Sequence, residues 1–268
     1  MTKEEVLEKL NQAFGKYEFY AEDHHYEKDK VKVGTSVTTI IEEYTEPFNT
    51  DEQAEQYARK VNRSKQEVID DWKYKNEFGC RKGSTCHEYV QSLWTGEHWF
   101  YDNFDFSGKY NDAVSKIKQL ADKFYEDYKD KLIHIKAEQI VGSEEYDIAG
   151  SVDGLFIDKQ TNKLILADYK TNTYITGLNK EPFIKSFLPP LEHLNDDKLH
   201  HYYLQLSMYK FLIEKYTDLT IDKMVIVYLT EINKDYEIVE IPYLKEEVEN
   251  ILEWRKWEWK KNTHILKH

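Results

Sequence analysis

Apolar residues recur along the chain at two spacings, and each spacing predicts one kind of secondary structure. Recurrence every three or four residues predicts helices over 2–14, 36–46, 51–94, 110–129, 193–216 and 244–262, and the range 51–94 holds two or three of them, the last starting after Gly83. Runs rich in β-branched and aromatic residues predict strands over 131–141 and 223–232, two strands within 148–172, and two more around a polar turn within 16–33.

The order of these elements predicts an α/β fold. Helices come first, and three consecutive strands, a helix and a further strand follow, which is typical of a sandwich built on a mixed sheet. The chain contains no internal repeat and no low-complexity linker. We therefore expect a single unit over 1–268, with a mostly helical part (1–130), a sheet core (131–235) and a C-terminal helix (236–268).

The stretch IAGSVDGLFIDKQTNKLILADYKTN, residues 148–172, places one aspartate in each of two strand-like runs. If DKQTN is the turn, the antiparallel register sets Ile157 opposite Leu164 and Asp153 opposite Asp168. Opposed residues place their Cβ atoms only about 4.5–5.5 Å apart, where like charges repel. A shared proton or a divalent cation relieves this repulsion, and a hard cation such as Mg²⁺ suits carboxylate oxygens. The hairpin therefore predicts a metal site.

Lys170 follows Asp168 by two positions, so both side chains point to the same face of the strand. An ammonium beside a cation can orient or deprotonate a water molecule, or stabilise the charge on a transferred phosphoryl group. The alternative is an exposed ion pair on a surface strand, which contributes little.

Other polar residues and one glycine accompany this pair. Glu138 lies in the preceding strand, from which it can reach the same cluster. Gly150 is a strand glycine, which marks a bulge or the close approach of another group. One face of the helix over 193–216 carries three polar residues spaced by four, namely His201, Gln205 and Tyr209.

Four short motifs in this order resemble those of the PD-(D/E)XK nuclease superfamily, in particular the branch of RecB-type and mitochondrial genome maintenance exonucleases. They are GSTCH (83–87), GSVD (150–153), DYK (168–170) and QLSMY (205–209), with a further echo in SVTTII (36–41). The resemblance covers more than half of the chain. It implies a restriction-endonuclease-like core with a mixed central sheet flanked by helices, plus an N-terminal helical elaboration.

The resemblance also implies roles for individual residues. Metal ligands would be His87, Asp153, Asp168 and the backbone carbonyl of Tyr169. Lys170 would be the catalytic lysine, and Glu138 an additional acidic residue of the catalytic group. Gln205 and Tyr209 would hold the site together or contact the nucleic acid strand. Ser36 and Thr38 would touch DNA, although capping of the helix over 36–46 explains them equally well.

We expect Mg²⁺- or Mn²⁺-dependent hydrolysis of DNA phosphodiester bonds by an exonuclease acting on single strands or DNA ends, in recombination, repair or phage DNA metabolism. A structure-specific (flap) endonuclease would use the same metal site. Two further hypotheses are a non-catalytic DNA-binding relative and an unrelated small-molecule enzyme with a carboxylate metal site. A single-strand-binding or recombination protein is the expected protein partner.

Charge and composition limit these expectations. The net charge of -13 argues against non-specific coating of nucleic acid, although aromatic residues, 15% of the chain, offer surfaces for base stacking. We expect the basic and aromatic clusters at 73–75, 81–82 and 254–261 along the path of the DNA, or else on solvated helix faces.

The two cysteines, Cys80 and Cys86, cannot supply the four thiolates that bind an iron–sulfur cluster in some relatives, so we expect no such cluster. They also cannot form a disulfide framework, and the chain shows neither a signal-peptide pattern nor a long apolar run. We expect no membrane association and a cytoplasmic location, in a bacterial or phage-infected cell.

Overall fold

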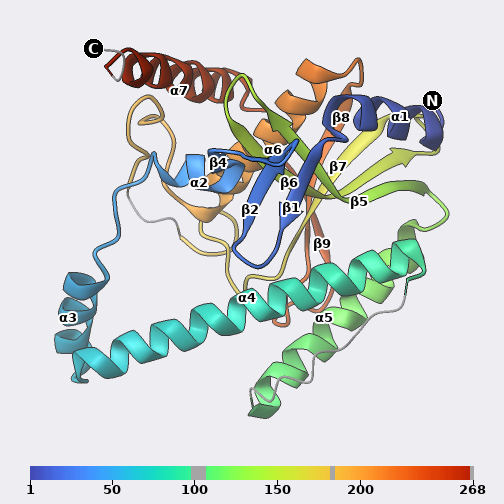
Figure 1. Cartoon of the computed structure of the whole chain (residues 1–268). Helices are drawn as coiled ribbons and strands as arrows, with labels where there is room; N and C mark the ends of the chain where they lie inside the picture. Colours follow the sequence, from blue (N-terminus) through green and yellow to red (C-terminus); the bar gives the residue numbers. More distant parts are fainter. Residues whose placement is uncertain (98–106, 182–184, 266–268) are drawn as a thin grey trace.

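The computed structural model describes residues 1–97, 107–181 and 185–265, with the side chains of 107 and of 258–265 left undescribed. Its centre is a mixed sheet (Figure 1) that confirms the α/β prediction. The strands of this sheet are β4 (Thr35–Ser36), β5 (Leu132–Ser143), β6 (Ile148–Asp158), β7 (Leu164–Lys170), β8 (Ile221–Tyr228) and β9 (Glu237–Glu240). Pairing is antiparallel for β5–β6, β6–β7 and β8–β9 and parallel for β4–β6 and β7–β8.

Seven helices lie in the described part of the chain: α1 (Lys3–Phe14), α2 (Val37–Glu42), α3 (Thr50–Val61), α4 (Lys65–Thr95), α5 (Ser107–Tyr128), α6 (Lys198–Tyr216) and α7 (Lys245–Ile265). Several begin where a short polar side chain caps the first turn. Thr2 and Ser64 form capping boxes with Glu5 and Glu67. Asp197 caps α6 by accepting a hydrogen bond from the His200 N–H.

The two faces of the sheet pack against different helices. Leu164 and Leu166 of β7 join the larger hydrophobic cluster with α6, whereas Ala167 and Tyr169 join a smaller cluster with Phe124 of α5. In Figure 1, α4 and α5 run beside each other below the sheet, and α7 lies above it. The alternation along β7 therefore fixes which face each side chain reaches.

The structure corrects two of the predicted elements and adds a strand to a third. No helix begins after Gly83, because α4 runs unbroken from Lys65 to Thr95; Cys86 and Val90 beyond the glycine pack in the cluster with α5. The two strands predicted around a polar turn within 16–33 are present as β1 (Tyr17–Tyr20) and β2 (His25–Lys28), and a short third strand, β3 (Val31–Lys32), pairs with β2. The last segment, 236–268, contains β9 ahead of α7.

None of the helices in the described ranges is both long and apolar enough to cross a membrane. Of the two thiols, Cys80 is exposed and Cys86 is buried. Burial raises the pKa of the Cys86 thiol, which makes it an unreactive core residue.

Candidate functional site

The candidate site lies at a stretch of β6 that has no hydrogen-bonded strand from the described residues along one of its two edges. β5 pairs with one edge of β6 along most of its length, so β4 and β7 share the other edge of β6. On that edge β7 pairs with residues 154–157 and β4 with residues 148 and 149. Neither strand pairs with residues 150–153. This gap in the hydrogen-bond ladder contains the GSVD motif.

The predicted hairpin register is confirmed, with Ile157 opposite Leu164 and Gly154 opposite Ala167. The ladder ends there, one pair short of the two aspartates. At the next position the carboxylate oxygen Oδ2 of Asp153 accepts a hydrogen bond from the Tyr169 N–H at 2.9 Å. The side chain of Asp153 thus takes the place of the next backbone acceptor and holds the separating strands together.

His87 reaches this point from α4. Its Nε2 lies 2.8 Å from the Tyr169 carbonyl oxygen, which can only accept, so Nε2 carries a proton. Its Nδ1 lies 3.5 Å from Oδ2 of Asp153. In the neutral imidazole this places a lone pair on Nδ1 facing a carboxylate. A proton or a cation between the two atoms is needed to make that contact favourable.

The Tyr169 carbonyl, expected as a metal ligand, therefore orients the imidazole in this structure. A carbonyl oxygen has a second lone pair. Its role as a ligand stays a prediction.

Glu138 lies in β5 between Ala137, opposite Gly154, and Gln139, opposite Val152, which places it across from Asp153. Its φ of 48° is left-handed, a conformation that costs about 1 kcal/mol for a residue with a side chain. The Glu138 carboxylate accepts a hydrogen bond from the Ser151 hydroxyl at 2.6 Å. Such local strain gathers at functional sites, and here it turns a carboxylate toward the gap.

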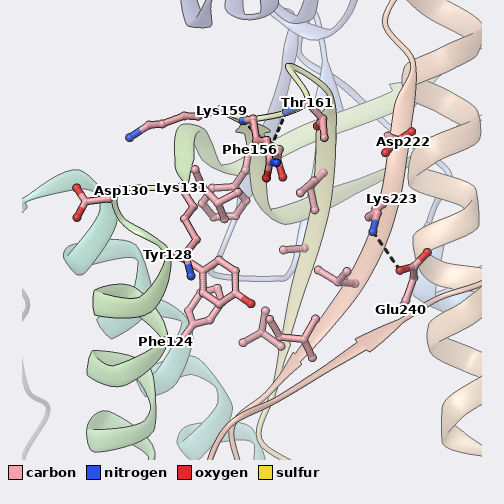
Figure 2. Close-up of a pocket in the computed structure, with 18 residues that line it drawn as sticks. Phe124, Tyr128, Asp130, Lys131, Phe156, Lys159, Thr161, Asp222, Lys223 and Glu240 are labelled. Atoms are coloured by element: carbon pink, nitrogen blue, oxygen red, sulfur yellow. Dashed lines mark hydrogen bonds and ion pairs between the residues drawn. The ribbon is translucent and has the colours of Figure 1, made fainter.

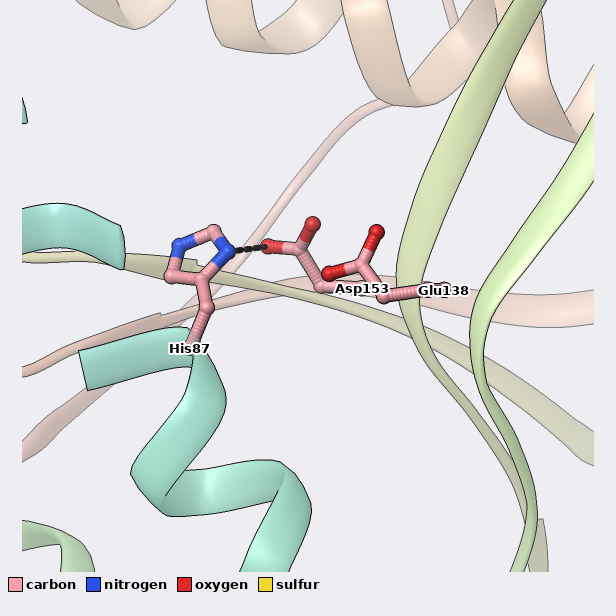
Figure 3. A group of neighbouring side chains, drawn as sticks. All are labelled: His87, Glu138 and Asp153. Carbon is pink, nitrogen blue, oxygen red and sulfur yellow. Dashed lines mark ion pairs between the residues drawn. The ribbon is translucent and has the colours of Figure 1, made fainter. Parts of the chain in front are cut away.

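His87, Glu138 and Asp153 each offer one ligand atom, and these atoms lie within 4.8 Å of one another. Figure 3 shows the Asp153 carboxylate facing the imidazole and the Glu138 carboxylate next to that of Asp153. Burial is the main cause that raises the pKa of Asp153 to about 7; His87 opposes the shift and Asp168 adds to it. One nitrogen and two carboxylate oxygens within this distance of one another are a donor set that fits a divalent metal ion.

Asp168 lies beside this group and pairs with Lys170. The ammonium of Lys170 is 2.6 Å from Oδ2 of Asp168, and the two side chains are 15% and 3% exposed. This excludes a surface ion pair as the explanation of the Asp-x-Lys triplet. Burial disfavours the charge on Lys170, but Asp168 and Asp153 outweigh it and raise the pKa of Lys170 above its ordinary value.

Because the pKa of Lys170 is raised, Lys170 is a stable cation in the metal-free site. Deprotonation of a water molecule by Lys170 would require a nearby cation that lowers this pKa, so that role stays a prediction. As a cation, Lys170 can orient a water molecule or stabilise negative charge.

Gln205 and Tyr209 lie on the same face of α6, and Gln205 Nε2 donates to the Tyr209 hydroxyl at 3.2 Å. A Cβ at Gly150 would come within 2.7 Å of the Tyr209 ring and 3.1 Å of Val37. The strand glycine is therefore explained by a close approach, as the sequence predicted. His201, the third polar residue of that helix face, pairs with Asp196 at 2.8 Å.

Ser36 and Thr38 lie at the start of α2. Ser36 caps this helix by accepting the Thr39 N–H at 3.0 Å, and it pairs with Ala149 next to the gap in β6. The hydroxyl groups of Ser36 and Thr38 are 3.0 Å apart. Capping explains Ser36, and DNA contact by either residue stays a prediction.

The basic clusters have different environments. Lys82 is 3% exposed and its ammonium is 2.8 Å from Glu231, so its placement on a DNA path was wrong. Lys73 and Lys75 are exposed on α4. Trp254 and Trp257 are exposed on α7, whereas the side chains of 258–261 lie outside the described residues.

Tyr202 also contacts the site, although it was not predicted from the sequence. The Lys170 ammonium lies 4.7 Å from the centre of its ring. The available signal was spacing: Tyr202 precedes Gln205 by three residues on α6, and side chains three apart on a helix are neighbours.

A cavity of about 630 Å³ lies elsewhere, beside α5 and the β7–β9 part of the sheet (Figure 2). Its lining includes Phe124, Tyr128, Ile165, Val225 and Ile238. None of His87, Glu138, Asp153, Asp168 and Lys170 lines it. The carboxylate group is therefore separate from this largely apolar hollow.

Without metal, Asp153→Asn is expected to stabilise the fold more at pH 7.5 than at pH 5.5. The folded protein holds the Asp153 proton up to about pH 7, whereas the unfolded chain releases it near the ordinary value of 3.8. Stability therefore falls as pH rises across this window, by on the order of 2 kcal/mol between pH 5.5 and 7.5, and the variant lacks this loss. Thermal unfolding of both proteins in EDTA measures the difference. An equal Tm difference at both pH values would contradict the burial of this carboxylate.

Taken together, the fold and the site define an α/β protein with a mixed sheet and a histidine–carboxylate group at a gap in that sheet. No family model matches the chain, and no curated protein matches it. Among solved structures, the crystal structure of SSO0001 is similar with a TM-score of 0.33 and 14% sequence identity, over 95% of this chain and 85% of that one. A likeness at this score informs neither fold nor function.

Proposed function

We propose that the chain is a metal-dependent deoxyribonuclease of the PD-(D/E)XK type, with a restriction-endonuclease-like core. It hydrolyses phosphodiester bonds at single-stranded DNA or DNA ends. The observation that carries this proposal is the convergence of His87, Glu138 and Asp153 within 4.8 Å, beside the buried Asp168–Lys170 ion pair.

The chemistry of the donors supports a divalent cation in this group. When bound, Mg²⁺ or Mn²⁺ would neutralise a phosphate and lower the pKa of water. His87, Glu138 and Asp153 would hold it, with Asp168 adjacent. His87 is oriented for this by its hydrogen bond to the Tyr169 carbonyl, an arrangement that fixes the tautomer of metal-binding histidines.

The reaction replaces one ester bond of the phosphodiester. A water oxygen forms a bond to phosphorus and releases one proton to solvent, one P–O ester bond breaks, and the leaving oxygen takes up one proton from solvent to become a hydroxyl. Lys170 remains protonated and stabilises the negative charge that develops on the phosphoryl oxygens. Asp153 and Asp168 keep this ammonium charged, because both raise its pKa.

A substrate panel tests the proposal. We expect the purified chain, with Mg²⁺ or Mn²⁺, to degrade linear single-stranded DNA from one end and to leave a covalently closed single-stranded circle intact. Substrates labelled at the 5′ or the 3′ end show the polarity, and a flapped duplex and an RNA strand of the same sequence show the structural and sugar preference. EDTA is the control for metal dependence.

Cutting of the closed circle, or a single cut at the base of a flap, would favour an endonuclease that uses the same chemistry. Failure to cleave any substrate with either metal would refute the nuclease proposal. In that case, binding of labelled DNA without cleavage identifies a DNA-binding relative.

A further inference from the structure

The Lys170 ammonium is held from two sides. Asp168 Oδ2 lies 2.6 Å from Nζ, and the ring centre of Tyr202 lies 4.7 Å from it. The negative face of an aromatic ring attracts a cation, and the attraction is strongest where water is excluded. The Lys170 side chain is 15% exposed, so little water competes with the ring.

The ring of Tyr202 is itself fixed. Its hydroxyl donates to Asn172 Oδ1 at 2.8 Å, just past the end of β7. The main-chain carbonyl of Asn172 in turn accepts a hydrogen bond from the Tyr228 hydroxyl at 2.7 Å. Tyr228 is the residue of β8 that pairs with Lys170 in the sheet. Helix α6 and two strands thus jointly set the position of the ring.

The backbone of Lys170 is fixed in the same way, because its carbonyl accepts the Leu229 N–H at 2.8 Å. The mobile part of the residue is therefore its side chain of four methylene groups. A lysine side chain has about 2 kcal/mol of rotamer entropy, which one carboxylate partner alone restrains weakly. A ring on the second side restricts the ammonium to a narrow position.

From this geometry we propose that Tyr202 is a positioning residue for Lys170. Its ring face holds the ammonium against Asp168, so that the remaining N–H is directed to an oxygen of the substrate phosphate. This role rests on the proposed nuclease function. Tyr202 itself touches neither substrate nor metal, and its effect passes entirely through Lys170.

Two substitutions separate the ring from the hydroxyl. Tyr202→Phe keeps the ring and removes the bond to Asn172, so we expect kcat to fall by less than about fivefold. Tyr202→Leu removes the ring, and we expect kcat to fall by about 30-fold with KM within about threefold, because misplacing a catalytic group by 1 Å costs up to about 100-fold. Tyr203→Leu, at the next position of α6, is the matched control and is expected to keep near wild-type kcat.

A third variant keeps the shape and changes only the ring's charge distribution. Fluorine atoms withdraw electron density from an aromatic face and so weaken its attraction for a cation. Replacing Tyr202 with trifluorophenylalanine is expected to lower kcat about three- to tenfold relative to Tyr202→Phe, with Tm and KM unchanged. A purely structural role would leave these two proteins equal, and this comparison stands even if Tyr202→Leu does not fold.

The outcomes distinguish this inference from the proposed function. An active wild-type enzyme with equal kcat for the phenylalanine and trifluorophenylalanine proteins overturns the positioning role and leaves the nuclease proposal standing. A rise in KM with unchanged kcat in Tyr202→Leu also overturns the positioning role, since that result indicates direct contact with the substrate. An inactive wild-type protein overturns both.

Discussion

Replacing Asp153 with asparagine is expected to reduce Mg²⁺-dependent DNA degradation by at least ~10³-fold, equivalent to ~4 kcal/mol of lost transition-state stabilisation. The amide removes the charge that a cation requires. It keeps an oxygen that can accept the Tyr169 N–H, so the two strands stay joined. Initial rates on end-labelled single-stranded DNA at saturating Mg²⁺ measure the loss, and circular dichroism verifies the fold.

Asp222→Asn is the matched control for that experiment. It makes the same change in net charge, but on the sheet surface, where Asp222 forms an ion pair with an exposed Lys163. We expect its rate to stay within about twofold of wild type, because exposed pairs contribute little. If Asp153→Asn keeps more than a tenth of the wild-type rate, the assignment of this carboxylate to the metal group fails.

Replacing Lys170 with methionine is expected to abolish cleavage and also to destabilise the protein. The substitution leaves Asp168, 3% exposed, as a buried carboxylate without its cation. Breaking one side of a buried pair costs about 3–5 kcal/mol, which lowers Tm by roughly 10 °C in a chain of this size. Activity is expected to fall by at least ~10²-fold, since charge stabilisation at the phosphoryl group is lost.

The double variant Asp168→Asn/Lys170→Met separates these two effects. It leaves no unpaired charge, so we expect the Tm to recover most of the loss while the cleavage rate stays low. An unchanged Tm in Lys170→Met alone would show that the ion pair contributes nothing to folding. Recovery of cleavage in the double variant would exclude Lys170 from the reaction.

The hairpin could be predicted in detail because its register and its faces depend only on residues close together in the sequence. A turn of known length sets the register of an antiparallel pair, and the alternation of side chains then assigns each residue to a face. Lys170 and Asp168 were placed on the same face for this reason. For Gly150 the sequence predicted either a bulge or a close approach, and the structure shows the close approach. The break in the ladder before Asp153 could not be foreseen, because it depends on β4 occupying the same edge of β6.

Glu138 illustrates the limit of pattern reasoning. The sequence placed Glu138 near the aspartates. Its left-handed backbone could not be predicted, because such a conformation is usually indicated by a glycine or an asparagine and this position is a glutamate. Lys82 illustrates the opposite error. As part of the basic pair at 81–82, Lys82 was predicted to be exposed. The packing of α4 instead brings its ammonium against Glu231 and buries it.

By itself, the sequence determined the α/β order of elements, the hairpin register and the shared face of the Asp-x-Lys triplet, because these follow from the periodicity of short segments. The motif resemblance had grouped His87 with Asp153, and the order of strands had placed Glu138 near them. The tertiary structure alone decided how closely these three side chains approach one another and that Tyr202 of α6 covers Lys170. Those contacts join segments far apart in the chain. They are set by how helices pack on the sheet, which no local pattern specifies.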